Sequence, residues 1–202
     1  ASSVCAPRYR IDEFPPKVLP WEDVRKILKI IPRDTVLGRR DFVMLLLMAT
    51  YGLGAAEVRR MRLNDISWRE KLLRVRRPKT EGPIELPLLP AIARALVAYL
   101  KYSRPKHVAL REIFVTMALP HRNISSSVLR HQIRVYAKKA GLTHEIFGSH
   151  LFRRSHATRQ IDSGVSQKIV SDILGHRKPA STSVYIRVAF RRLRAIALPV
   201  PR

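Results

Sequence analysis

Four polar side chains in the C-terminal part of the chain have types and spacing suited to chemistry on a phosphate. His150 and Arg153 form a His-x-x-Arg pair, and on a helix residues three apart share one face, so both would reach toward one point. His176 follows a glycine that ends an amphipathic run, and Tyr185 comes nine residues later. Imidazole, guanidinium and phenol groups with few acids around them suit an anionic phosphate better than a carbonyl or a metal.

The charge of the chain points to a polyanionic partner. Lys and Arg number 39 against 15 Asp and Glu, a formal net charge of +24. Residues 86–202 hold 21 of these cations against four acids, a net of +17, so the basic excess lies with the four polar side chains. Such a field attracts polyanions, which makes nucleic acid the leading partner and an acidic membrane surface the weaker one.

Composition also argues against several classes of protein. The single cysteine, Cys5, allows no disulfide framework and no cysteine-based zinc site. No group of Asp, Glu and His has ligand-like spacing, so we predict no metal, no cofactor and no metal-dependent nuclease. No apolar run approaches the roughly 20 residues of a spanning helix, and nothing resembles a signal peptide. A reducing, prokaryotic-like cytoplasm is the expected location.

Periodicity predicts a mainly α-helical chain with one small antiparallel β-sheet, an α+β class. The alternation of Leu73 and Val75 with two arginines predicts a half-exposed hairpin whose loop carries Lys79. The predicted helices cover residues 21–31, 40–51, 55–61, 90–102 and a stretch from a cap among 125–127 to 140, with three or four more after 148. The predicted strands cover residues 72–77, 84–88 and 113–115.

The order and spacing of the polar residues resemble the catalytic domain of the tyrosine recombinase (phage integrase) family. That domain ends with His-x-x-Arg, then Leu-Gly-His, then a tyrosine; here these are His150 with Arg153, Leu174-Gly175-His176, and Tyr185. Lys79 falls where the family carries a lysine in its hairpin. The likeness covers residues 18–198.

The resemblance implies a site-specific recombinase, integrase or transposase that cuts and rejoins double-stranded DNA through a 3′-phosphotyrosyl intermediate, without metal or ATP. Tyr185 would be the nucleophile, while Arg153 and His176 would bind the phosphate oxygens. His150 would accept the phenol proton, and Lys79 would protonate the departing 5′-oxygen.

The resemblance also implies how the chain is organised. Residues 18–202 would form the catalytic domain, and residues 1–17 would be a linker or tail leading from an N-terminal DNA-binding domain that these residues do not include. The segment from Ala189 onward would either dock on a neighbouring protomer, giving a homotetramer on two duplexes, or pack in cis. No membrane association is implied.

One position departs from the family pattern. Where the family has a phosphate-binding arginine, this chain has Gly54. Arg59, Arg60 and Arg62 lie nearby, but even the nearest two are displaced by roughly 7–9 Å along a helix. Two hypotheses therefore stand beside the active recombinase. One is a recombinase-like DNA-binding protein that has lost cleavage, and the other is a type IB topoisomerase with the same phosphotyrosine chemistry.

Overall fold

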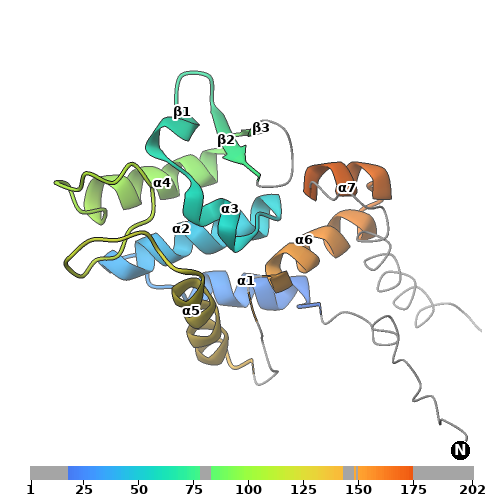
Figure 1. The fold of residues 1–202 in the computed structure, drawn as a ribbon. Helices are drawn as coiled ribbons and strands as arrows, with labels where there is room; N and C mark the ends of the chain where they lie inside the picture. Colours follow the sequence, from blue (N-terminus) through green and yellow to red (C-terminus); the bar gives the residue numbers. More distant parts are fainter. Residues whose placement is uncertain (1–17, 78–82, 143–147, 149, 175–202) are drawn as a thin grey trace, which may run out of the picture.

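The computed structural model describes residues 18–77, 83–142, 148 and 150–174. Within these ranges the chain forms seven α-helices, a short 3-10 helix (Leu63–Asp65) and a three-stranded antiparallel sheet (Figure 1). The predicted α+β class is confirmed. None of the helices in these ranges has both the length and the apolar character needed to cross a membrane.

Helix α2 (Val36–Tyr51) lies at the centre of the helical part. Its middle carries Met44, Leu45, Leu47 and Met48, all fully buried, as expected for a strongly apolar helix. Its neighbours are α1 (Trp21–Ile30), α3 (Ala55–Arg60), α4 (Pro90–Tyr102), α5 (Ser126–Lys139) and α6 (His150–Asp162). Because helices from both halves of the sequence pack on α2, this helix fixes their relative positions.

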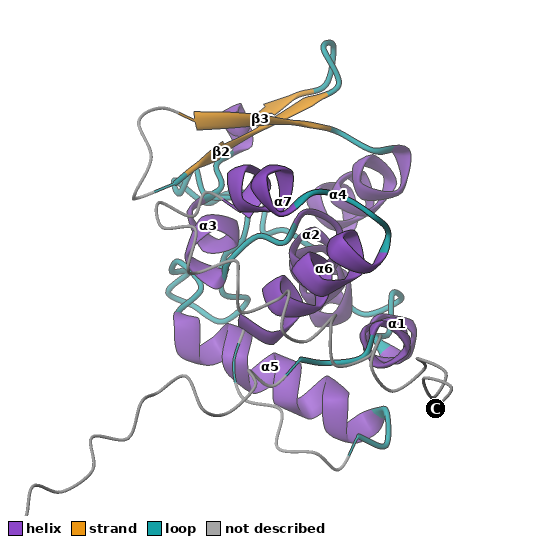
Figure 2. Ribbon diagram, turned by 90° about the vertical axis from the view of Figure 1, so that its right-hand side faces the viewer, coloured by secondary structure: helices purple, strands orange, loops and turns teal. Residues whose placement is uncertain are grey.

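The sheet consists of β1 (Ile66–Ser67), β2 (Leu72–Arg76) and β3 (Pro83–Pro87) in that spatial order. It lies along one side of the molecule (Figure 2), where β2 contacts α3. Leu73 and Val75 are fully buried, whereas Arg76 on the other face is exposed. The predicted half-exposed hairpin is therefore confirmed, and β1 adds a strand too short to show a period in the sequence.

Two expected elements differ from the structure. Residues 113–115 form no strand. Their side chains are fully buried, but the backbone at 112–115 pairs through the isolated bridges Arg62↔Glu112 and Val115↔Asn123 in place of a ladder, and the Ile113 carbonyl accepts the Tyr99 hydroxyl. A short buried apolar run looks the same in sequence whether or not it pairs. Helix α2 begins four residues before the predicted start, because the Thr35 hydroxyl accepts the Gly38 N–H at 3.0 Å and caps the helix there.

The C-terminal part of the described chain packs as two helices. Helix α6 lies against α1 and α2, and α7 (Gln167–Leu174) packs on α6 through Val170 and Leu174, which are buried with Ala157. This arrangement brings the end of α7 close to the α2–α3 junction. The segment 1–17, the hairpin loop 78–82 and the predicted helices after residue 174 lie outside the described residues.

Candidate functional site

The structure describes three of the six positions singled out from the sequence. His150 and Arg153 belong to the first turn of α6, and Gly54 immediately precedes α3. Lys79, His176 and Tyr185 lie outside the described residues. The site can therefore be built from the groups that surround Arg153.

The junction between α2 and α3 is a tight turn next to Arg153. Gly52 ends α2 with φ of 64°, in the left-handed region that glycine adopts without strain. A β-carbon added there would lie 2.8 Å from side-chain carbons of both His156 and Leu174. This close packing against α6 and α7 turns the Gly52 carbonyl toward Arg153, whose Nη1 donates a hydrogen bond to it at 3.2 Å.

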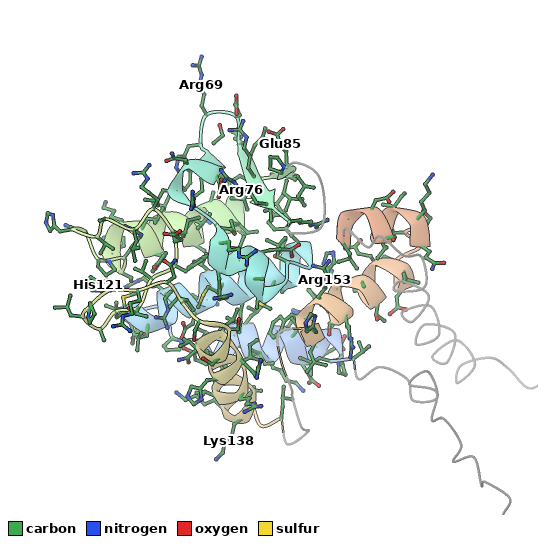
Figure 3. The ribbon with its side chains drawn as sticks, in the orientation of Figure 1. Arg69, Arg76, Glu85, His121, Lys138 and Arg153 are labelled. Atoms are coloured by element: carbon green, nitrogen blue, oxygen red, sulfur yellow. The ribbon has the colours of Figure 1, made fainter. Side chains whose placement is uncertain are left out.

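Arg153 connects three helices through its guanidinium. Nη1 also donates to the Glu57 carboxylate of α3 at 2.9 Å, and Nη2 donates to the Leu174 carbonyl at the end of α7. Figure 3 shows Arg153 where α6 approaches α3. The last carbonyls of a helix lack intrahelical partners, so Arg153 satisfies one of them while its fork is held in a fixed orientation.

Glu57 is the acidic centre of the site. The residue is buried, and its Oε2 accepts the Arg153 Nη1–H and the backbone N–H of Gly54, the latter at 2.5 Å. Its other oxygen, Oε1, lies 3.0 Å from Nε of Arg77. One carboxylate thus links the start of α3 to two arginines from other elements.

Arg77 is the residue of this site that the sequence analysis missed. It follows β2 directly, is 7% exposed, and donates from Nη2 to the Ile173 carbonyl and from Nη1 to the Asp172 carbonyl at 3.4 Å. The sequence nevertheless contained a signal that Arg77 would be buried. In the strand register residue 77 shares the inward face of Leu73 and Val75, so an arginine there had to be buried and paired.

The site holds more positive than negative charge. Two guanidiniums, those of Arg77 and Arg153, face one carboxylate, that of Glu57. The carbonyls at the end of α7 offset part of this excess, because a helix C-terminus carries a partial negative charge. Burial lowers the pKa of Arg77, and the positive charge of Arg153 lowers it further. The arrangement can accept an anion whose oxygens replace or join the α7 carbonyls.

His150 has the properties of a proton acceptor. The residue is exposed, yet partial burial of its ring lowers its pKa, and the positive charges of Arg154 and Arg153 lower it further. A pKa below the ordinary value of 6.5 leaves the imidazole neutral at pH 7. It can then take a proton from a group that approaches Arg153.

The sequence of the chain is similar to a known family and to several known proteins. Residues 17–192 match the phage integrase family. A protein of Sinorhizobium fredii that is named as an integrase/recombinase, y4gC, is 40% identical over 190 residues, which are 92% of this chain and 96% of y4gC. Tyrosine recombinase XerD of Proteus mirabilis is 30% identical over 182 residues, which are 90% of this chain and 58% of XerD.

The fold has counterparts among solved structures. The crystal structure of the XerH site-specific recombinase bound to a palindromic difH substrate, a post-cleavage complex, superimposes with a TM-score of 0.75 at 19% identity. The match covers 90% of this chain and 52% of the XerH chain. The chain therefore spans nearly all of y4gC and less than two thirds of XerD and XerH.

Proposed function

The chain belongs to the phage integrase family, and on this premise we propose that it is a site-specific DNA recombinase that cuts and rejoins duplex DNA through a 3′-phosphotyrosyl intermediate. The observation that carries the proposal is the fixed, partly buried guanidinium of Arg153, in a cluster with an excess of positive charge, at the helix start that also bears His150. A tyrosine recombinase needs such a fixed cation where the phosphodiester reacts.

The chemistry of phosphoryl transfer explains this need. In the transition state, negative charge spreads over the nonbridging oxygens of the phosphate, and cations already in position stabilise it without reorganising. The planar fork of Arg153 can bind two of these oxygens at once. The contacts of Arg153 Nη1 to Glu57 and Gly52 hold the guanidinium in place before DNA arrives, and the contact of Nη2 to the Leu174 carbonyl is the one that a phosphate oxygen would replace.

The proposed step conserves bond energy. The Tyr185 hydroxyl oxygen attacks the phosphorus, a P–O bond to tyrosine forms, and the P–O5′ bond of the DNA breaks. The phenol proton goes to His150, whose lowered pKa keeps it neutral and able to accept. Lys79 gives a proton to the departing 5′-oxygen, and His176 donates a hydrogen bond to the phosphate. Attack by another 5′-hydroxyl reverses the step and joins new strands.

The partner in this proposal is double-stranded DNA, bound by several copies of the chain. The net charge of +24 supports strong electrostatic attraction to the phosphate backbone. We propose a homotetramer on two duplexes, since exchange of strands needs two cut sites held together. Sedimentation of the protein with and without duplex DNA tests the tetramer, and a monomeric complex at saturation would contradict it.

Trapping on a nicked duplex tests the proposed function. A nick just downstream of the cut lets the short 5′-hydroxyl fragment diffuse away, so the covalent protein–DNA complex accumulates. Duplexes with randomised sequence serve as the probe, and trapped molecules are sequenced to find the site. We expect a trapped complex that survives denaturation. Salt-sensitive DNA binding without any trapped complex would instead favour a recombinase-like DNA-binding protein.

A further inference from the structure

We propose that Arg77 supplies the second phosphate-binding guanidinium of this site, in place of the side chain that Gly54 lacks. This inference rests on the proposed function and names a further residue for it. Of the three arginines nearest to Gly54 in the sequence, two have partners elsewhere. Arg59 donates to the Ile124 carbonyl at 2.8 Å through Nη1, although its buried Nε has no hydrogen-bond partner in the described part of the chain, and Arg62 pairs with Glu112 at 3.6 Å. Arg60 is exposed at the end of α3.

Arg77 and Arg153 converge on the same groups from different elements. Arg77 extends from the end of β2 and Arg153 from α6, and both guanidiniums contact Glu57 and the carbonyls at the C-terminal end of α7. Two guanidiniums that contact the two oxygens of one carboxylate and consecutive carbonyls of one helix end can also contact different oxygens of one phosphate. The α7 carbonyls occupy the place that we assign to those oxygens.

Arg77 has hydrogen-bonding capacity to spare. Its Nε forms an ion pair with Glu57 Oε1 at 3.0 Å but meets no hydrogen-bond geometry in the described part of the chain. Its Nη1 contact to Asp172 is long, at 3.4 Å. A buried donor without a partner is uncommon and calls for an explanation. An oxygen of the substrate phosphate would replace the long contact of Nη1 to the Asp172 carbonyl.

The geometry at Gly54 shows that an arginine there would meet the same cluster. A β-carbon added to Gly54 would lie 3.3 Å from Glu57 Oε2 and 3.7 Å from Arg153 Nη1. The backbone of Gly54, with φ of −79° and ψ of 159°, is extended and open to any residue. A longer side chain at this position would therefore begin beside the guanidinium pair that Arg77 completes.

A rescue experiment tests the proposal. Arg77→Met is compared with wild type by the rate of trapping on a nicked duplex recovered from the randomised library. We expect a loss of about 10²–10³-fold, the size seen when one transition-state donor is removed. Gly54→Arg in the Arg77→Met background should regain at least about tenfold, because it places a guanidinium beside Arg153. Arg76→Met, on the exposed face of the strand, is the matched control and should keep the wild-type rate.

A second readout separates binding of phosphate from support of the fold. A methylphosphonate at the attacked position removes one negative charge from the substrate, so a residue that neutralises that charge becomes less necessary. The deficit of Arg77→Met should shrink on this substrate. If Arg77→Met folds poorly, Arg77→Lys, which keeps the charge with fewer donors, is measured in its place with the same two comparisons.

The outcomes are distinct. If wild type traps DNA and Arg77→Met traps it at the same rate, Arg77 is not part of the site. If the Arg77→Met deficit is unchanged both by Gly54→Arg and by the methylphosphonate, Arg77 only supports the end of α7, and the proposal is wrong. If wild type never forms a trapped complex, the proposed function fails and this inference fails with it.

Discussion

Arg77 and Arg153 lie against opposite oxygens of a single buried carboxylate, that of Glu57, with ion-pair distances of 3.0 and 2.9 Å. The two arginines come from a strand end and a helix start that are far apart in the sequence, and α3 brings the carboxylate between them. This relationship keeps two cations close together in a site with little solvent. It predicts that the site depends on Glu57 for stability. It also predicts that an external anion is needed to neutralise the remaining positive charge of the two arginines.

Removal of the Glu57 charge should destabilise the protein. Glu57→Gln leaves two largely buried guanidiniums without a counter-ion, and breaking a buried ion pair in this way costs about 3–5 kcal/mol. We expect the free energy of unfolding, measured with urea, to fall by an amount in that range. Added sulfate should recover more stability in this variant than in wild type, because the anion can take the place of the carboxylate.

Glu85→Gln is the control for that experiment. Glu85 pairs with Arg74 across the exposed face of the hairpin at 3.0 Å, where solvent screens the charges. Its replacement should leave the urea midpoint unchanged within error. Equal effects of the two substitutions would show that burial of the Glu57 cluster has no energetic consequence.

Apart from the start of α2, the sequence was sufficient for the helices and the hairpin that the structure describes and for the placement of His150 and Arg153 in one helical turn, because period and spacing are local signals. It was not sufficient for the partners of Arg153. Glu57 and Arg77 become neighbours only when α2 has positioned α3, β2 and α6, and no local pattern records that packing. The strand register alone predicts that Arg77 points inward. No sequence pattern predicts that the Glu57 carboxylate pairs with it and so makes its burial possible. The expected strand at 113–115 failed for a similar reason, since burial alone does not specify pairing.

Gly52→Ala should be more destabilising than an ordinary glycine substitution. A left-handed backbone costs a non-glycine residue about 1–2 kcal/mol, and the new methyl group would also sit 2.8 Å from His156 and Leu174. Overpacking of this kind adds about 1–3 kcal/mol. Gly164→Ala is the matched control, because Gly164 has φ of 85° but no atom within 4 Å of an added β-carbon. Equal losses of melting temperature in the two variants would contradict the close packing at Gly52.

Stability should fall as the pH is lowered through the histidine range. Burial lowers the pKa of His156, which is 5% exposed and whose Nδ1–H donates to the Ala49 carbonyl at 3.1 Å. The unfolded chain, with the ordinary pKa of 6.5, then binds a proton that the folded protein does not. The free energy of unfolding should therefore decrease below pH 6.5, by up to about 1.4 kcal/mol per pH unit, until the lowered folded pKa is reached.

Replacement of the ring isolates this contribution. His156→Phe should flatten the dependence of the urea midpoint on pH, even though the variant is less stable overall. The positive charges of Arg159 and Arg153 act in the same direction on His156, and the lowered pKa of His150 adds a slope of the same sign. An unchanged slope in His156→Phe would place the proton uptake elsewhere.

DNA binding should weaken steeply with salt. The logarithm of the association constant should fall linearly with the logarithm of salt concentration, with a slope of about −0.9 for each phosphate contacted. Arg153→Met should reduce the steepness by about one unit, because one phosphate contact is lost. Arg69→Met, at the tip of the turn between β1 and β2 and far from Arg153 in Figure 3, should have a smaller effect. Equal effects of the two substitutions would argue against a phosphate contact by Arg153.

The identity of the residue joined to DNA tests the proposed mechanism most directly. Wild-type protein is trapped on the nicked duplex, digested with protease and nuclease, and the adduct is located by mass spectrometry. We predict a nucleotide 3′-phosphate on Tyr185, no adduct in Tyr185→Phe, and unchanged DNA binding by that variant. Attachment at another residue, or a trapped complex that persists in Tyr185→Phe, would contradict the mechanism.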